Sequence, residues 1–143
     1  MKFSEKSLER LATCDKDLQL VMNTAIKVSR VDFGIDEGHR SVERQQQLYK
    51  QRPPVTTKDG IVFRSKHNYE PSRAVDIYPW VNGAKNYRLD IMTYMAGLIE
   101  GISEILFLAG QTTHRIRWGG NWDMDGEIIT DQTLIDTPHF ELI

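Results

Sequence analysis

The segment that decides the interpretation of this chain is Arg64-Ser65-Lys66-His67-Asn68-Tyr69-Glu70-Pro71-Ser72-Arg73-Ala74-Val75-Asp76-Ile77-Tyr78-Pro79. It places His67 and Asp76 nine positions apart, with a turn-rich insert between them. Residues 74–78 alternate in polarity as a β-strand does, so the sequence predicts a strand that holds Asp76 and a loop that lets His67 swing beside it. With a third ligand from elsewhere in the chain, this pair could bind one divalent metal ion and leave a coordination position for water.

A segment near the C-terminal end of the sequence offers that third ligand. It runs Asp136-Thr137-Pro138-His139-Phe140-Glu141-Leu142-Ile143. Pro138 favours extended backbone, and the residues after it predict a short strand with His139 and Glu141 on one face. Asp136 lies three residues before His139. A carboxylate so placed can stay off the metal and accept a proton from metal-bound water, as a general base does.

Length and composition limit the classes of protein to consider. A chain of 143 residues predicts one domain with a buried core. Its net charge of −2 and pI near 6.1 give no electrostatic reason to expect nucleic acid or an anionic membrane surface as partner. The single cysteine, Cys14, excludes an internal disulfide. We find no signal peptide and no apolar run approaching the ~20 residues that span a bilayer, so we expect a cytoplasmic protein without membrane insertion.

The order of regular elements indicates the fold class. The sequence predicts helices over residues 4–13 with Ser4 as N-cap, after Asp15 as a second N-cap, after Ser41 as a third, and over residues 88–109. Strands are expected at residues 31–35, 74–78, 115–118 and 139–143, turns at residues 53–60 and 80–86, and either a short strand or an apolar loop anchor at residues 61–63. Short scattered strands interrupted by a long helix predict an α+β fold with a small, mainly antiparallel sheet packed against helices.

Two further groups of polar residues have more than one interpretation. Arg40 follows a predicted strand at the start of a helix, where side chains often line a cleft, but a solvated surface cation fits equally well. Asn121, Asp123 and Asp125, followed by Gly126, match the opening of a calcium-binding EF-hand loop. Gln132 stands where that loop needs a glutamate, which favours a plain acidic turn over a calcium site.

Taken together, these segments resemble a family of zinc peptidases. Ser65-Lys66-His67 and Ala74-Val75-Asp76 look like its first signature, and Asp136 with His139 looks like its second. The family contains D-alanyl-D-alanine carboxypeptidases and dipeptidases, and the phage endolysins that act as L-alanyl-D-glutamate peptidases are especially similar. The loop between His67 and Asp76 has eight residues and no glycine, whereas the family usually has six with a glycine.

The resemblance implies a function and assigns roles to single residues. It implies a Zn²⁺ ion bound by His67, Asp76 and His139, with Asp136 as the general base. It implies that Arg40 binds a substrate carboxylate or polarises the scissile carbonyl, and that Ser65 contacts substrate or orients His67. The expected protein is a monomeric, single-domain endolysin (residues 1–143) that accumulates in the host cytoplasm and cuts the peptidoglycan stem peptide between L-alanine and D-glutamate.

Two alternatives remain open from the sequence. One keeps the zinc chemistry and changes the bond to D-Ala-D-Ala, as in a carboxypeptidase. The other is a wall-binding or virion module of the same fold without catalysis.

Overall fold

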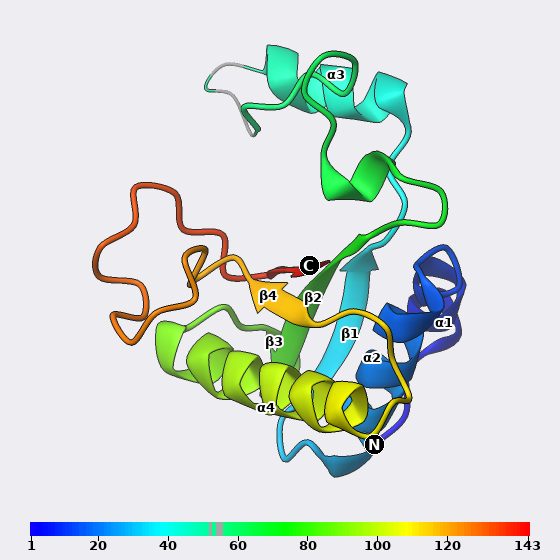
Figure 1. The fold of residues 1–143 in the computed structure, drawn as a ribbon, viewed down its shortest axis with the longest axis vertical. Helices are drawn as coiled ribbons and strands as arrows, with labels where there is room; N and C mark the ends of the chain where they lie inside the picture. The colour runs from blue at the N-terminus through cyan, green and yellow to red at the C-terminus, as the bar shows by residue number, and fades with distance from the viewer. Residues whose placement is uncertain (52, 54–55) are drawn as a thin grey trace.

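A small antiparallel sheet lies at the centre of the structure, a computed structural model that describes residues 1–51, 53 and 56–143 (Figure 1). The elements in chain order are α1 (Glu5–Leu11), α2 (Lys16–Val28), β1 (Asp32–Glu37), α3 (Val42–Lys50), the 3₁₀ helix η1 (Lys66–Asn68), β2 (Ala74–Val81), β3 (Ala84–Lys85), α4 (Leu89–Leu108), β4 (Ile116–Trp118) and β5 (His139–Leu142). The predicted α+β class with a mainly antiparallel sheet is confirmed.

Strand β5 occupies the middle of the sheet although it comes last among these elements. The strand order is β1-β2-β5-β4, and β3 pairs with β2. All pairs of neighbouring strands are antiparallel. Asp76 of β2 lies directly opposite His139 of β5 in this register. Directly opposed residues project from the same face of a sheet, so the pairing alone brings these two side chains together.

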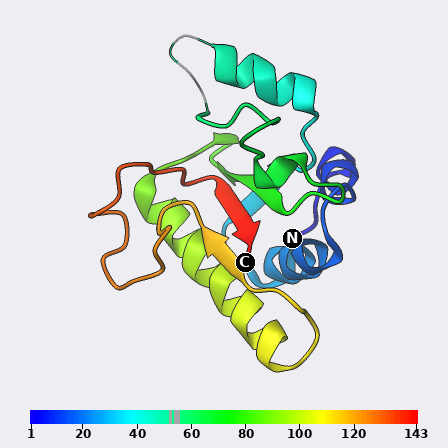
Figure 2. The ribbon, with the colours of Figure 1, turned by 45° about the horizontal axis from the view of Figure 1, so that its top comes forward.

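The hydrophobic core lies on the other face of the sheet, because side chains alternate along a strand. Val75 and Ile77 of β2 and Phe140 and Leu142 of β5 belong to one buried cluster with α2 and α4. Figure 2 shows α4 running beneath the strands. His139 and Glu141 alternate with the core residues of β5 and therefore face away from this cluster.

The caps predicted from sequence are confirmed at three helices. The Ser4 side chain accepts a hydrogen bond from the Ser7 amide, Asp15 accepts one from Asp17, and Ser41 accepts one from Arg44. The long helix α4 also has nearly its predicted bounds. It is followed by Gly110 with a φ of 72°, a left-handed conformation that suits glycine at a helix end.

One expectation about α4 is wrong. This helix of 20 residues contains an 18-residue window with a mean hydropathy of 1.5, enough by length and composition alone to cross a membrane, although the sequence analysis found no such run. Met92, Met95, Ala96 and Ile99 are buried against the sheet and α2. One face of the helix therefore packs on the core, while only 28% of its apolar window is buried.

Three local expectations also need correction. The region assigned as turn at residues 80–86 contains the end of β2 and all of β3, joined through Asn82 and Gly83, whose φ angles are 53° and 81°. Residues 61–63 form neither a strand nor a buried anchor, since their side chains are exposed. His67 lies in η1 and not in a loose loop. Within the expected turn at residues 53–60, positions 54–55 lie outside the described residues, as does position 52 before it.

Candidate metal centre

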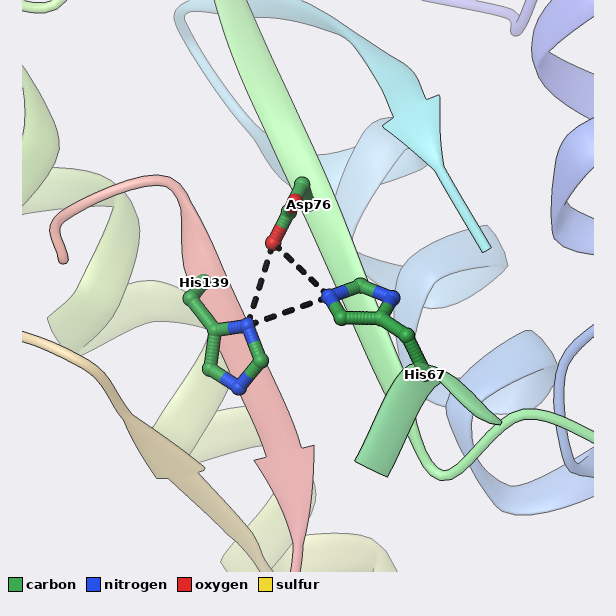
Figure 3. A group of neighbouring side chains, drawn as sticks. All are labelled: His67, Asp76 and His139. Atoms are coloured by element: carbon green, nitrogen blue, oxygen red, sulfur yellow. Dashed lines mark hydrogen bonds and ion pairs between the residues drawn. The ribbon is translucent and has the colours of Figure 1, made fainter. Parts of the chain in front are cut away.

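Three side chains from separate elements converge on one point above the sheet (Figure 3). Nε2 of His67 lies 3.2 Å from Oδ1 of Asp76, and Nδ1 of His139 lies 3.1 Å from the same oxygen. The two ring nitrogens are 3.2 Å apart. The structure therefore brings together the three residues that the sequence singled out as ligands of one metal ion.

The short helix η1 holds His67 in place through a reciprocal cap. The Ser65 side chain accepts a hydrogen bond from the His67 amide, and the Asn68 side chain accepts one from the Ser65 amide. Both side chains are buried. Ser65 thus fixes the backbone of His67.

Hydrogen bonds on the outer side of each imidazole fix its tautomer. Nδ1 of His67 lies 2.7 Å from the carbonyl oxygen of Gly38, and Nε2 of His139 lies 3.0 Å from Oε2 of Glu141. A carbonyl or carboxylate oxygen only accepts, so the neutral ring must carry its proton on that side. In this neutral form, which is the form that binds a metal, the lone pairs of both rings would point at Asp76; without a metal, a protonated ring donates to Asp76 instead.

The charges in this cluster are those of a site built for a cation. Burial opposes the charge of Asp76, but hydrogen bonds from His139 and His67 outweigh it and hold the pKa of Asp76 well below its ordinary value. Burial likewise opposes a charged His139, yet the carboxylates of Asp76 and Glu141 raise the pKa of His139 to about 9. Two imidazoles and one carboxylate form a donor set that suits Zn²⁺.

Glu141, to which the sequence analysis gave no role, connects His139 to the guanidinium of Arg117. Its Oε1 accepts a hydrogen bond of 2.6 Å from Nη2 of Arg117, while its Oε2 faces His139. Burial opposes its charge, but these two partners lower the pKa of Glu141 to about 2. The alternation along β5 had placed Glu141 on the face of His139, and this was the signal for its role.

Asp136 lies beside the cluster in the wall of the same cleft. Its backbone is fixed by hydrogen bonds to Gly119 and from His139. A Cβ at Gly119 would stand 2.3 Å from the Asp136 carbonyl oxygen, so only glycine allows the two segments to approach this closely. Burial raises the pKa of the Asp136 carboxyl, and the negative charge of Asp76 acts in the same direction.

Arg40 is not the solvated surface cation that one interpretation allowed, because its side chain is only 10% exposed. Glu37 accepts two hydrogen bonds of 2.7 Å from the guanidinium, and Gln45 accepts a third of 2.9 Å. Nη2 of Arg40 also lies 3.8 Å from Oδ2 of Asp76. Arg40 therefore contributes positive charge to the cluster, but most of its hydrogen-bonding capacity is already used.

An open cleft of about 940 Å³ gives access to the cluster. Helix α3 and residues 56–58 form one wall, and residues 131–136 with Trp122 form the other. The Trp122 ring lies 5.5 Å from the ring of His139.

The acidic loop after β4 differs from the EF-hand pattern. One carboxylate oxygen from each of Asp123, Asp125 and Asp131 lies within 4.8 Å of the other two, and all three residues are exposed. Asn121 is buried, and its Nδ2 donates a hydrogen bond of 3.0 Å to the carbonyl of Asp125. The converging group thus includes Asp131, which the sequence pattern did not contain, in place of Asn121.

These features define an α+β protein with a candidate metal centre of two histidines and one aspartate in an open cleft. The sequence model of the phage L-alanyl-D-glutamate peptidases matches residues 1–143, and the chain belongs to this family. It is 26% identical over 148 residues to the L-alanyl-D-glutamate peptidase of Escherichia phage T5, covering 99% of this chain and 98% of that protein. It is also similar to the crystal structure of the L-Ala D-Glu endopeptidase ChiX of Serratia marcescens, with a TM-score of 0.75 and 26% identity over 100% of this chain and 90% of that one.

Proposed function

We propose that this chain is a single-domain zinc peptidase that hydrolyses the bond between L-alanine and D-glutamate in the peptidoglycan stem peptide. Membership of the phage L-alanyl-D-glutamate peptidase family supports the reaction and the substrate. The observation that carries the zinc assignment is the convergence of His67, Asp76 and His139 within hydrogen-bonding distance, with the outer nitrogen of each imidazole placed against an acceptor oxygen.

A bound zinc ion would lower the pKa of a water molecule toward ~7 and polarise the scissile carbonyl. The protein supplies the proton transfers. Asp136 accepts the proton of the attacking water and delivers it to the amine of the leaving D-glutamate. Burial raises the pKa of Asp136, and a carboxylate that binds its proton more readily is a better base and a useful acid for the second step.

The remaining polar groups orient the ligands and the substrate. Gly38 and Glu141 keep the two imidazoles in the ligand tautomer. Arg40 places positive charge beside Asp76, from where it can polarise the carbonyl of the substrate. Binding a substrate carboxylate in bidentate fashion would require Arg40 to release Glu37. We therefore favour the electrostatic role for Arg40.

The biological setting that fits this activity is host lysis. As a phage endolysin, the protein would accumulate as a monomer in the host cytoplasm and reach the wall after the membrane has been permeabilised. A calcium ion at the predicted ligands Asp123 and Asp125 is a secondary proposal, supported by the proximity of their carboxylate oxygens to each other and to one of Asp131, all within 4.8 Å. Calcium titration of the wild type and of Asp125→Asn, followed by calorimetry, tests it: equal heats for both proteins would reject the site.

Digestion of purified muropeptides tests the proposed function directly. The protein is incubated with muropeptides as purified, after dialysis against a chelator, and after zinc is added back, and the products are identified by mass spectrometry. We expect products with a new D-glutamate N-terminus, their loss on chelation and their recovery with zinc. Release of free D-alanine alone would indicate the carboxypeptidase, and absence of any product would favour the non-catalytic wall-binding module.

A further inference from the structure

Residues 61–63 form an exposed apolar tip at one end of the molecule. The side chains of Ile61, Val62 and Phe63 are 64%, 74% and 65% exposed, although they are consecutive and strongly hydrophobic. Figure 1 shows that α3 and the loop after it form a lobe at the opposite end of the molecule from α4. Single exposed apolar residues are ordinary, but three consecutive ones at a protruding turn call for an explanation.

The turn that presents these side chains is well fixed. Oδ1 of Asp59 accepts hydrogen bonds from the amides of Ile61, Val62 and Phe63, at 2.9, 3.0 and 3.0 Å. The Gly60 amide donates to the Phe63 carbonyl at 3.1 Å, and Gly60 has a φ of 85°. The backbone groups of the tip are therefore bonded to the turn itself, while its apolar side chains project outward.

The tip does not serve as a lid over the cleft. The cleft is lined by Thr56, Thr57 and Lys58 before the tip and by Ser65 after it, but by none of the three apolar residues, as far as the described chain goes. The tip is also separate from the core, since none of its residues belongs to the hydrophobic cluster in the part of the chain that the structure describes. Its apolar surface is available to a partner outside the molecule.

The lobe that carries the tip is basic, although the chain as a whole is acidic. Residues 42–66 contain six Lys or Arg and two Asp or Glu, whereas the whole chain has a net charge of −2. Arg44, Lys58 and Arg64 are exposed on this lobe. One of the two acids, Asp59, uses a carboxylate oxygen to hold the turn. The overall charge thus conceals an uneven distribution.

We propose that residues 61–63 and the surrounding cations dock the protein on an anionic phospholipid surface. Apolar side chains at the tip would enter the region between headgroups and acyl chains, and the cations would contact lipid phosphates. A soluble polyanion would explain the cations but would leave three exposed apolar side chains without a role. This combination of an apolar tip with a basic rim favours a bilayer over a wall polymer. The proposal concerns adhesion at the surface and does not depend on the peptidase activity.

Vesicle flotation with the full chain tests this proposal. Vesicles of phosphatidylglycerol and phosphatidylethanolamine are compared with vesicles of phosphatidylcholine alone, each at low and high salt. We expect wild-type protein to float with the anionic vesicles, to bind phosphatidylcholine at least about tenfold more weakly, and to dissociate as salt screens the cations. The double variant Val62→Ser/Phe63→Ser should lose at least about tenfold in partitioning.

A matched control uses two exposed apolar residues at the other end of the molecule. Ile105 and Leu108 on α4 are 69% and 72% exposed, and Ile105→Ser/Leu108→Ser should bind vesicles as the wild type does. Circular dichroism verifies that both variants fold, and cleavage of soluble muropeptides should be unchanged in the tip variant. Wild-type protein that ignores vesicles, that binds both lipid types equally, or that binds only an isolated anionic wall polymer would overturn the proposal. So would equal losses in the two double variants.

Discussion

Replacing Glu141 with glutamine gives a sharp test of how the metal centre is organised. The change is nearly isosteric and removes one negative charge. In the native site one carboxylate oxygen accepts from His139 at 3.0 Å and the other accepts from Arg117 at 2.6 Å. Glutamine has a single acceptor oxygen, so it cannot serve both donors. Either Arg117 or His139 must then face an NH₂ group.

The structure indicates how large the effect should be. If the amide oxygen turns to Arg117, its NH₂ group faces Nε2 of His139 and favours the tautomer with the proton on Nδ1, the nitrogen that faces Asp76. With zinc on Nδ1 the ring must carry its proton on Nε2, where it would face the NH₂ group of the glutamine, a donor that cannot accept it. Groups that orient a ligating histidine typically contribute roughly 10- to 100-fold to metal affinity, or about 1.4 to 2.8 kcal/mol. We expect Glu141→Gln to lose zinc affinity by this factor and to regain activity when zinc is in excess.

Competition with a chromophoric chelator measures the zinc dissociation constant, and muropeptide cleavage as a function of zinc concentration measures recovery. Glu104→Gln is the matched control, because Glu104 also accepts two hydrogen bonds from an arginine, Arg115. That pair is about half exposed, so its loss should change little. An unchanged zinc affinity in Glu141→Gln would refute our account of the tautomer, and an equal loss in both variants would show a nonspecific charge effect.

Four other outcomes follow from the same structure. Asp136→Asn should retain zinc and lose roughly 10²- to 10⁴-fold in rate. Steady-state kinetics with metal analysis measures both, and a normal rate would show that Asp136 is not the general base. In the metal-free protein the pKa of His139 is raised from 6.5 to about 9, so zinc binding at pH 7 should release a proton, detectable by calorimetry in buffers of different ionisation heat. By the same linkage, the stabilisation from protonated His139 is complete below pH 6.5 and is lost as pH rises through 9. Denaturant titrations of the metal-free protein measure this change in the free energy of unfolding, and equal values below pH 6.5 and above pH 9 would contradict it. Asp17→Ala should lower the free energy of unfolding by about 1 to 3 kcal/mol, because the buried carboxylate accepts from the amides of Thr113 and His114, whereas Asp90→Ala on the exposed start of α4 should not.

Features that depend on neighbouring residues could be predicted from the sequence. Ser4, Asp15 and Ser41 cap their helices because a side chain two or three positions from an amide can reach it whatever the rest of the chain does. The hairpin between β2 and β3 was missed although Asn82-Gly83 is a strong turn signal, because the strand before it contains Pro79.

Features that depend on distant partners could not be predicted from spacing alone. The meeting of His67 and His139 was expected from family resemblance, whereas the register that opposes Asp76 to His139 appears only in the sheet. The contact between Glu37 and Arg40 spans only three residues, but the sequence did not show it, because the conformation of the turn between β1 and α3 decides whether the two side chains meet.

The central position of β5 has a consequence for biosynthesis. Strand β5 lies between β2 and β4 and is hydrogen-bonded to both. The strand edges of β2 and β4 that face β5 therefore have no partner until residues 139–142 have left the ribosome. His139 arrives with the same strand. A nascent chain from which residues 139–142 have not yet emerged therefore lacks both a closed sheet and one of the three proposed metal ligands.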